Sequence, residues 1–337
     1  MKYYEASFYQ NESGKKVRCN LCAHHCLIQD GCLGFCRVRQ NQGGKLVSLN
    51  YGRLIASHTD PIEKKPLYHF LPGSKAYSIA TPGCNLRCEW CQNWEISQAD
   101  CGPTLGIIPD TTPESVVNAA LRSRSASIAY TYTEPTIFYE FARDTALLAK
   151  EQGLKNLFVT NGMMTTAVIE ELALWLDAAN VDIKAFTEEA YRKYTGGRLS
   201  AVLECCQQLK QRGVWLEVTT LIVPGINDDE AQLTSLTEYI AGKLGQETPW
   251  HLSRYFPQYR SRAAATSLQS LENAEQIGRK AGLKFIYPGN VHAETVTKCP
   301  QCGTDIIHRL DYRLQTNRIK KGRCPQCWAE IPGVWEE

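Results

Sequence analysis

The sequence predicts an α/β fold, built as a partial barrel of parallel strands between two small cysteine-rich modules. Short apolar runs recur every ~25–45 residues, the size of a βα unit, and amphipathic stretches separate them. Twelve of the fifteen cysteines fall into three groups, within residues 19–36, 84–91 and 299–327. Such spacing is typical of metal ligands in a reducing compartment, and a chain of 337 residues is too long for a disulfide scaffold.

Residues 1–72 form the first expected domain, because they hold five cysteines, several glycines and no sustained hydrophobic period. We expect this domain to fold around a metal. Four thiolates suffice for zinc, which would stabilise a domain too small for a large core, or for an auxiliary iron–sulfur cluster. The sequence leaves both open. The candidate ligands are Cys19, Cys22, Cys26 and Cys36, with Cys32, His24 and His25 as alternates.

The barrel is expected over residues 73–292, where seven apolar runs are bounded by turn residues and read as strands. No glycine-rich phosphate loop accompanies them. A barrel-like arrangement of six βα units is therefore favoured over a doubly wound dinucleotide-binding sheet, although periodicity alone leaves the second arrangement open. The expected strands are Tyr77–Thr81, Ser127–Tyr132, Asn156–Thr160, Asn180–Lys184, Trp215–Ile222, Trp250–Ser253 and Lys284–Tyr287.

Helices are expected between these strands. Pro113–Arg122 follows Thr112, a residue type favoured at a helix N-cap. Thr136–Lys150 ends shortly before Gly153, and Asp229–Leu244 follows a Pro-Gly turn. Strands that alternate with helices in this way predict a parallel sheet.

After residue 292 this alternation stops, and residues 293–337 form the third expected module. Two CxxC pairs, 21 residues apart, bracket a short hairpin-like segment. Four thiolates on two such knuckles suit a closed tetrahedral zinc site, and a rubredoxin-like iron or an iron–sulfur cluster is the alternative. The expected ligands are Cys299, Cys302, Cys324 and Cys327.

Cys84, Cys88 and Cys91 form a CxxxCxxC motif directly after the first expected strand of the barrel. Loops at the carboxyl ends of parallel strands form the ligand-binding face of such folds. A [4Fe–4S] cluster normally takes four cysteines, so three thiolates leave one iron open to a ligand. The alternatives are a zinc site completed by a distant histidine, or buried structural thiols. No histidine lies within ten residues of the motif.

This motif, with Trp90 just before its last cysteine, resembles that of the radical S-adenosylmethionine (SAM) superfamily. The resemblance implies a partial barrel of radical SAM type in which Cys84, Cys88 and Cys91 hold a catalytic [4Fe–4S] cluster. It further implies that the open iron binds the amino and carboxylate groups of SAM. An electron from the cluster then cleaves the C–S bond, and a 5′-deoxyadenosyl radical abstracts hydrogen. A reductant such as flavodoxin or ferredoxin is implied as a partner.

Other segments resemble the SAM contacts of this superfamily and of its glycyl-radical activating enzymes. Thr133-Glu134-Pro135 resembles a Gly-Gly-Glu-Pro segment that lacks its glycines here, and Thr160-Asn161-Gly162 resembles a ribose-side Thr-Asn-Gly. Asp182-Ile183-Lys184 resembles an Asp-x-Lys whose lysine meets the SAM carboxylate. The alternative for each is a structural role, such as a helix cap, a solvated lysine or a core histidine. The implied SAM contacts are Glu134, Asn161, Asp182, Lys184 and His251.

Residues 19–26, 34–39 and 60–69, with the closing Ile-Pro-Gly-Val-Trp, resemble the radical SAM enzyme of the AmmeMemoRadiSam system, a three-protein association. The resemblance covers nearly the whole chain and implies Memo-like and AMMECR-like partners. Older naming places this family near pyruvate formate-lyase activating enzyme. The chain departs from the family at Ala23, where proline is usual, and at Phe256, where histidine is usual.

The sequence therefore predicts a cytoplasmic radical SAM enzyme of oxidoreductase type that acts on a protein, an RNA or a small molecule. A glycyl-radical enzyme activase is a narrower alternative, and a non-enzymatic iron–sulfur and zinc metalloprotein is a further one. The formal net charge of +2, from 37 basic and 35 acidic residues, argues against a nucleic-acid binder. Neither a secretory leader nor an apolar run of ~18 residues is present, so no membrane association is expected.

Overall fold

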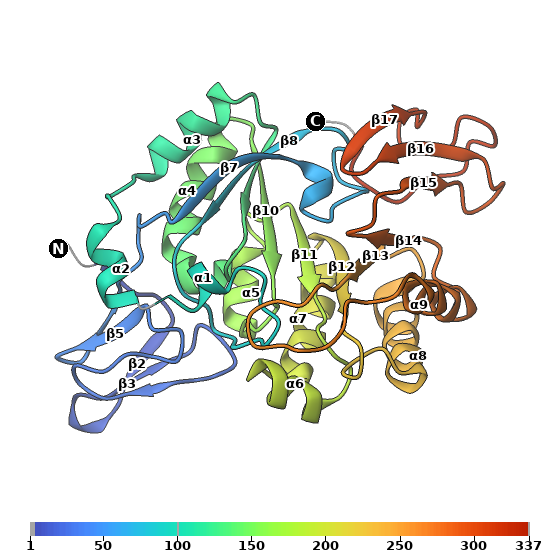
Figure 1. The fold of residues 1–337 in the computed structure, drawn as a ribbon. Coiled ribbons are helices and arrows are strands. Elements are labelled where there is room, and N and C mark those ends of the chain that lie inside the picture. Colours follow the sequence, from blue (N-terminus) through green and yellow to red (C-terminus); the bar gives the residue numbers. More distant parts are fainter. Residues whose placement is uncertain (1–3, 100, 336–337) are drawn as a thin grey trace.

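The computed structural model describes residues 4–99 and 101–335 (Figure 1). An eight-stranded sheet forms its centre, in the order β14-β13-β12-β11-β10-β9-β8-β7. Strands β8 to β14 are parallel, and β7 (Ala56–Pro61) pairs antiparallel with β8 at one edge. A doubly wound sheet needs a reversal of strand order, whereas here each parallel strand lies beside the next one in the chain. The sheet is therefore a partial barrel.

The seven parallel strands fall on the seven expected apolar runs. All four residues of β9 are buried, as expected for a strand covered on both faces. The expected partial barrel is thus confirmed, and β14 adds a seventh parallel strand to six βα units. The strands are β8 (Lys75–Ala80), β9 (Ser127–Tyr130), β10 (Lys155–Thr160), β11 (Ala178–Asp182), β12 (Trp215–Ile222), β13 (Trp250–Arg254) and β14 (Ile286–Gly289).

Helices connect these strands and cover the outside of the curved sheet (Figure 1). Thr112 caps the first long helix by accepting a hydrogen bond from the backbone N–H of Ser115 at 3.3 Å. No helix in the described ranges is long and apolar enough to cross a bilayer. The helices are α1 (Trp94–Ser97), α2 (Cys101–Ile107), α3 (Pro113–Arg122), α4 (Tyr139–Glu151), α5 (Thr166–Leu172), α6 (Glu188–Thr195), α7 (Leu199–Gln211), α8 (Glu230–Tyr239) and α9 (Leu268–Lys280).

Two expected helices differ from the structure at their ends. Before α4, Pro135–Phe138 forms a 3₁₀ turn, because Pro135 opens it and the Glu134 side chain caps it. After α8, residues Ile240–Gly245 continue as a π-helix up to Gly245, whose φ is 94°. Helical pattern alone does not separate these variants from an α-helix.

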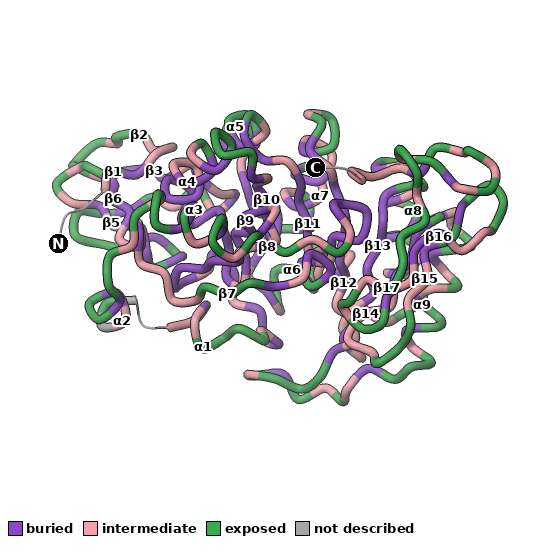
Figure 2. Tube along the Cα trace, turned by 90° about the horizontal axis from the view of Figure 1, so that it is seen from above, coloured by how far each residue is buried: buried purple, intermediate pink, exposed green. Residues whose placement is uncertain are grey.

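The N-terminal region packs two three-stranded sheets against the barrel. Their apolar side chains, such as Val17 and Leu46, belong to the same hydrophobic core as Ile79 of β8. Figure 2 shows buried residues continuing from the barrel strands into this region. The sheets have the orders β1-β6-β5 and β2-β3-β4, with β1 (Tyr4–Glu5), β2 (Tyr9–Asn11), β3 (Val17–Cys19), β4 (Leu27–Ile28), β5 (Arg39–Gln42) and β6 (Lys45–Ser48).

The C-terminal region forms a separate antiparallel sheet of β15 (Glu294–Lys298), β16 (Asp305–Leu310) and β17 (Arg313–Asn317). It has a small hydrophobic core of its own around Ile306 and Ile307. The division of the chain at residues 72 and 292 stays a prediction.

Two buried contacts attach this region to the barrel. The Arg309 guanidinium donates to the carbonyl of Tyr68 at 2.6 Å, and the His69 ring donates to the carbonyl of Pro332 at 2.7 Å. Since both acceptors are backbone carbonyls in buried surroundings, these hydrogen bonds fix how the sheet sits against the barrel.

Candidate active site at the carboxyl ends of the strands

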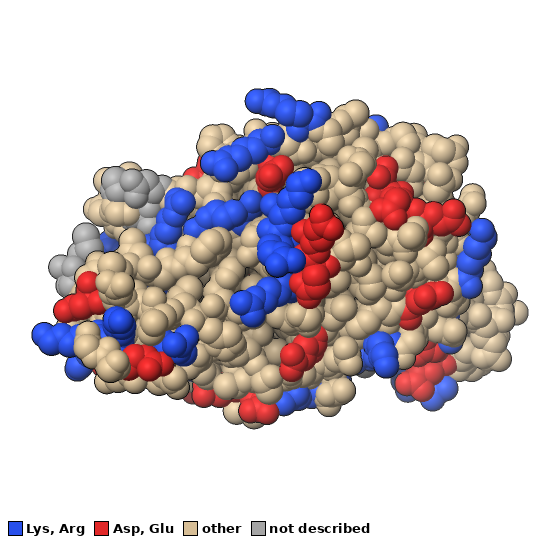
Figure 3. Space-filling view, turned by 90° about the horizontal axis from the view of Figure 1, so that it is seen from below, with Lys and Arg blue, Asp and Glu red and all other residues tan. Residues whose placement is uncertain are grey.

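The carboxyl ends of the parallel strands surround a cavity of about 500 Å³, a volume typical of a small-molecule site. Figure 3 views the molecule from the side toward which β10 and β11 run, and lysines and arginines gather there in a band beside a smaller acidic group. All eight residues expected to hold the cluster or contact SAM line this cavity. They are Cys84, Cys88, Cys91, Glu134, Asn161, Asp182, Lys184 and His251.

The three cysteines lie on the loop between β8 and α1. The backbone N–H of Leu86 donates to Cys84 Sγ at 3.3 Å, and Cys91 Sγ lies 3.2 Å from Ser97 Oγ. Burial raises the pKa of Cys88 to about 12 and raises that of Cys84 as well, so both thiols are protonated without a cation. A bound metal centre would supply the charge that keeps them as thiolates.

The three cysteines of the motif are not gathered as the ligands of a single metal ion are. Thiolates on one zinc lie about 3.8 Å apart, given Zn–S bonds of about 2.3 Å. Within the described residues, the only group of three or more possible ligand side chains close enough together to hold one metal ion is in the C-terminal region. The central thiols instead line the cavity at the strand ends, where three thiolates could hold a [4Fe–4S] cluster and leave one iron open.

Glu134 is fully buried, and hydrogen bonds from the protein occupy both oxygens of its carboxylate. Oε1 accepts from the hydroxyls of Thr136 at 2.6 Å and Thr160 at 2.7 Å, and Oε2 accepts from the backbone N–H of Asn161 at 2.8 Å. Burial raises the pKa of this carboxyl, whereas the hydrogen bonds favour the ionised form. Its side chain thus ties the end of β9 to the end of β10.

Asn161, directly after β10, binds the loop that carries the three cysteines. Its Nδ2 donates to Asn85 Oδ1 at 2.8 Å, and its Oδ1 accepts from the backbone N–H of Met163 at 3.0 Å. Asn85 is fully buried and directly follows Cys84. The amide of Asn161 therefore fixes the position of the first cysteine, a contact that the sequence did not predict.

Asp182 and Lys184 form an ion pair at the end of β11. Lys184 Nζ lies 2.9 Å from Asp182 Oδ2, and the lysine side chain is 17% exposed. Burial lowers the pKa of Lys184, but the Asp182 carboxylate and the nearby Cys88 thiol more than offset this and raise it above its ordinary value. Lys184 is therefore a fixed positive charge in the cavity wall, beside Cys88.

Glu217, which the sequence analysis did not single out, orients His251. The carboxylate lies fully buried on β12, and its Oε2 is 2.6 Å from His251 Nε2. Although burial opposes ionisation, the hydrogen bond from His251 lowers the pKa of Glu217. The carboxylate also accepts from the backbone N–H groups of Tyr68 and His69, at 3.0 and 2.8 Å. A charged residue inside an apolar strand was the sequence feature that could have revealed it.

A second buried ion pair borders the cavity. Lys65 is 2% exposed, and its Nζ lies 2.6 Å from Asp60 Oδ2. The hydroxyl of Tyr132 donates to the same carboxylate, and Lys65 Nζ lies 4.5 Å from the centre of the Tyr132 ring. The sequence analysis used residues 60–69 only as part of a family resemblance and gave these side chains no role.

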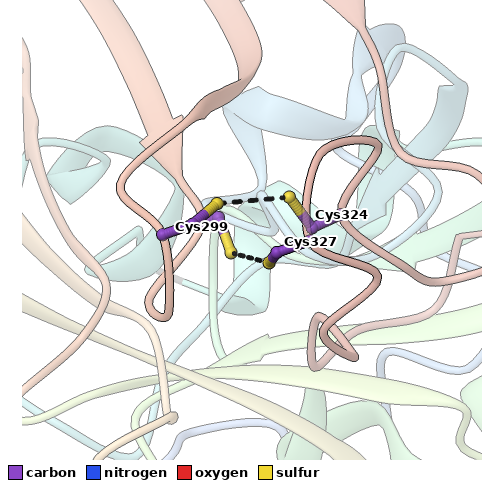
Figure 4. A group of neighbouring side chains, drawn as sticks. Cys299, Cys324 and Cys327 are labelled. Atoms are coloured by element: carbon purple, nitrogen blue, oxygen red, sulfur yellow. Dashed lines mark hydrogen bonds between the residues drawn. The ribbon is translucent and has the colours of Figure 1, made fainter.

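The two outer cysteine groups differ in geometry. In the C-terminal group, Cys299 Sγ lies 3.6 Å from Cys327 Sγ, and Cys302 Sγ lies 3.7 Å from Cys324 Sγ (Figure 4). These spacings fit one tetrahedral metal ion. The N-terminal group, made of Cys19, Cys22, Cys26 and Cys36, lines a second, small cavity.

Comparison with known proteins agrees with this geometry. A family model described as the radical SAM superfamily matches residues 78–236. An uncharacterized protein of Methanocaldococcus jannaschii is 41% identical over 332 residues, which cover 97% of this chain and 98% of that protein. The pyruvate formate-lyase 1-activating enzyme of Escherichia coli is 26% identical over 160 residues, 47% of this chain and 65% of that enzyme.

Among solved structures, a radical SAM methyltransferase from Sphaerobacter thermophilus matches with a TM-score of 0.50 at 18% identity. The match covers 66% of this chain and 68% of that one. At this identity, the likeness shows the fold alone.

Proposed function

This chain belongs to the radical SAM superfamily, and we propose that it binds SAM and a [4Fe–4S] cluster in the cavity at the strand ends. When bound, the cluster supplies the electron that cleaves the C–S bond of SAM, so that a 5′-deoxyadenosyl radical can abstract hydrogen from a substrate. The observation that carries the proposal is that eight residues expected from separate segments line one cavity. Coincidence does not account for this convergence.

The residues of the cavity have distinct proposed roles. Cys84, Cys88 and Cys91 hold the cluster, and Lys184 pairs with the carboxylate of SAM, since the Asp182 carboxylate keeps its ammonium group charged despite burial. His251 donates its Nε2–H to Glu217, which leaves Nδ1 as the ring acceptor for a ligand in the cavity that His251 lines.

Glu134 and Asn161 have a proposed structural role: they position other parts of the SAM site. Because protein groups already occupy the carboxylate of Glu134, its segment meets SAM through the backbone. Asn161 keeps the cysteine loop in place through Asn85. The proposed SAM site is therefore held by side chains whose own hydrogen bonds are satisfied within the protein.

Radical SAM enzymes generally need an external reductant, and we propose a flavodoxin or ferredoxin for this role. Memo-like and AMMECR-like proteins are proposed partners on the strength of the family resemblance. A zinc ion is the proposed occupant of the C-terminal thiols, because their spacing fits a single ion.

A glycyl-radical enzyme activase is the second candidate function. It is favoured by the 26% identity with the pyruvate formate-lyase 1-activating enzyme over 160 residues. That match covers 47% of the chain, so it bears on the barrel and leaves the outer cysteine groups unexplained.

The experiment is reductive cleavage of SAM without added substrate. The chain is reconstituted anaerobically with iron and sulfide, mixed with SAM and dithionite, and assayed for 5′-deoxyadenosine by mass spectrometry. The Cys88→Ala variant should lose product by about 1,000-fold or more, because cleavage needs the cluster. Cys32→Ala, which removes an exposed cysteine, is the matched control and should retain activity.

Two outcomes would count against the proposal. Product formed equally by Cys88→Ala would place the chemistry outside this cluster. A fully loaded chain that neither cleaves nor binds SAM would favour the non-enzymatic metalloprotein.

A further inference from the structure

The N-terminal cysteine group surrounds a small cavity whose other walls are mainly apolar. Besides Cys19, Cys22, Cys26 and Cys36, the walls include Leu21, Ile28, Phe35 and Ile137. Cys19 and Cys36 are buried, and all four thiols are free of disulfides. Free thiols that face one apolar space, with no acidic side chain among its walls, form a suitable ligand set for a soft metal centre.

The four sulfur atoms are not gathered as tightly as those of the C-terminal group. All four residues lie in the described part of the chain, where the C-terminal thiols are the only group of three or more such side chains close enough together to hold one metal ion. Thiolates that share one zinc would be about 3.8 Å apart. The N-terminal thiols instead line a small cavity, as the central three line the larger one.

Arg39 provides a second, independent observation. Its side chain is 1% exposed and lines the same cavity. Nη2 pairs with Glu140 at 2.5 Å and Nη1 donates to the carbonyl of Ser7 at 2.9 Å, but Nε has no hydrogen-bond partner. A buried N–H without an acceptor is costly, and the sulfur atoms of an anionic cluster would accept a hydrogen bond from it.

The cavity lies directly behind the loop that carries the central cysteines. A Cβ placed on Gly83 would come within 3.0 Å of the carbonyl oxygen of Cys36, so the two cysteine groups touch through their backbones. The ring of His24 donates to the carbonyl of Asn85 at 2.7 Å, and Arg87 donates to the carbonyl of Phe35. Only glycine fits at position 83, where φ is 100°.

We propose that Cys19, Cys22, Cys26 and Cys36 hold a second iron–sulfur cluster of the [4Fe–4S] type. Four thiolates complete the coordination of such a cluster, so this centre carries no open iron. Its contact with the Cys84 loop suits it to accept one electron from an external reductant and pass that electron to the central cluster. This transfer role rests on the proposed function, whereas the binding of the cluster does not.

The test is the metal content of the full chain after anaerobic reconstitution, which needs no SAM cleavage. The expected content is about eight irons and eight sulfides per chain, for two four-iron clusters. The Cys84→Ala/Cys88→Ala/Cys91→Ala variant should keep about four irons and four sulfides. The Cys22→Ser/Cys26→Ser variant should also keep about four, now at the central site, and Cys32→Ser should keep all eight.

A wild-type chain with about four irons and two zinc ions would overturn the proposal, because the N-terminal group would then hold zinc. A triple variant that stays folded by circular dichroism but retains no iron would overturn it as well. Electron paramagnetic resonance adds a readout that a structural metal would not affect. Reduction of both clusters should broaden each signal through magnetic interaction, and the broadening should vanish in either variant.

Discussion

The C-terminal and the central cysteine groups use the same side chain in two different geometries. In the C-terminal group, the sulfur atoms of Cys299 and Cys327 lie 3.6 Å apart, and those of Cys302 and Cys324 lie 3.7 Å apart. In the central group, three sulfur atoms are spread around a cavity of about 500 Å³. The first arrangement leaves a metal no free position, whereas the second keeps a place for a ligand.

The supports of the two groups differ as much as their geometry. Cys299 and Cys324 sit in a small core made by the C-terminal sheet itself. The central loop depends instead on side chains from other strand ends, such as Asn161, which lies 76 residues after its partner Asn85. A closed metal site can thus be built locally, whereas an open one needs the whole barrel.

The largest expected effect comes from removing a ligand of the closed site. Cys324→Ala should release the C-terminal metal, whose binding free energy is about 10–16 kcal/mol for structural zinc in small modules. We expect one zinc less per chain by elemental analysis and rapid proteolysis within residues 293–335. SAM binding should persist, because the cavity lies on other strands.

Cys88→Ala, which removes a ligand of the central site, is the converse control for that experiment. It should lose the iron of the central cluster, about four irons per chain, and keep the C-terminal zinc. Loss of both metals in both variants would mean that the two sites fold as one unit.

Lys184→Met should weaken SAM binding without loss of iron. A hydrogen bond to a charged group contributes about 1.5–3 kcal/mol, so the Kd for SAM should rise about 10- to 150-fold. Isothermal titration calorimetry under anaerobic conditions measures this. Lys193→Met, which changes an exposed lysine on α6, should bind as the wild type does. Equal affinities of the two variants would argue against a role for Lys184 in holding SAM.

Glu217→Gln should lower 5′-deoxyadenosine formation by about 10- to 100-fold, since residues that orient a ligand-facing group typically matter by this factor. The amide cannot accept from His251 and from two backbone N–H groups as strongly as the carboxylate does. The measurement is the rate at saturating SAM, together with the pH profile of that rate. Glu230→Gln, at an exposed position on α8, is the control. An unchanged pH profile in Glu217→Gln would contradict an orienting role.

His69 should make stability depend on pH near the junction with the C-terminal sheet. Burial lowers the pKa of His69 to about 4, below the value of about 6.5 in an unfolded chain. The unfolded state therefore binds more protons between these values. The free energy of unfolding is fully retained above pH 6.5 and falls as the pH drops toward 4, by about 1 kcal/mol between pH 6.5 and 5.5.

Urea unfolding at several pH values tests this expectation. His69→Gln should flatten the dependence, whereas His58→Gln, at an exposed position, should leave it unchanged. Parallel curves for all three proteins would mean that His69 is protonated equally in both states.

Much of the fold was predictable because its signals are local. The patterns that predict the strand Trp215–Ile222 and the capped helix Pro113–Arg122 each lie within about ten residues. The structure has both elements at those positions. The cysteine motifs were also predictable, because each is defined by a short sequence spacing.

The supporting contacts were not predictable, since they join residues that are distant in the sequence. Glu217 gains its role from Tyr68 and His69, which lie 149 and 148 residues away, and from His251 on the next strand. Asp60 and Lys65 are near neighbours in the sequence, but their buried pair also accepts a hydrogen bond from Tyr132, 72 residues after Asp60. Such roles depend on the folded sheet, and no short pattern encodes them.

The hydrogen bond from His69 to Pro332 also sets an order of events during synthesis on the ribosome. The two residues lie 263 positions apart, so translation at about 5–20 residues per second separates them by about 13 to 53 seconds. For most of that interval the imidazole lacks both of its native partners, because the other one, Tyr287, lies 218 residues after it. The two hydrogen bonds of the His69 ring can therefore both form only after the segment that follows β17 has emerged from the ribosome.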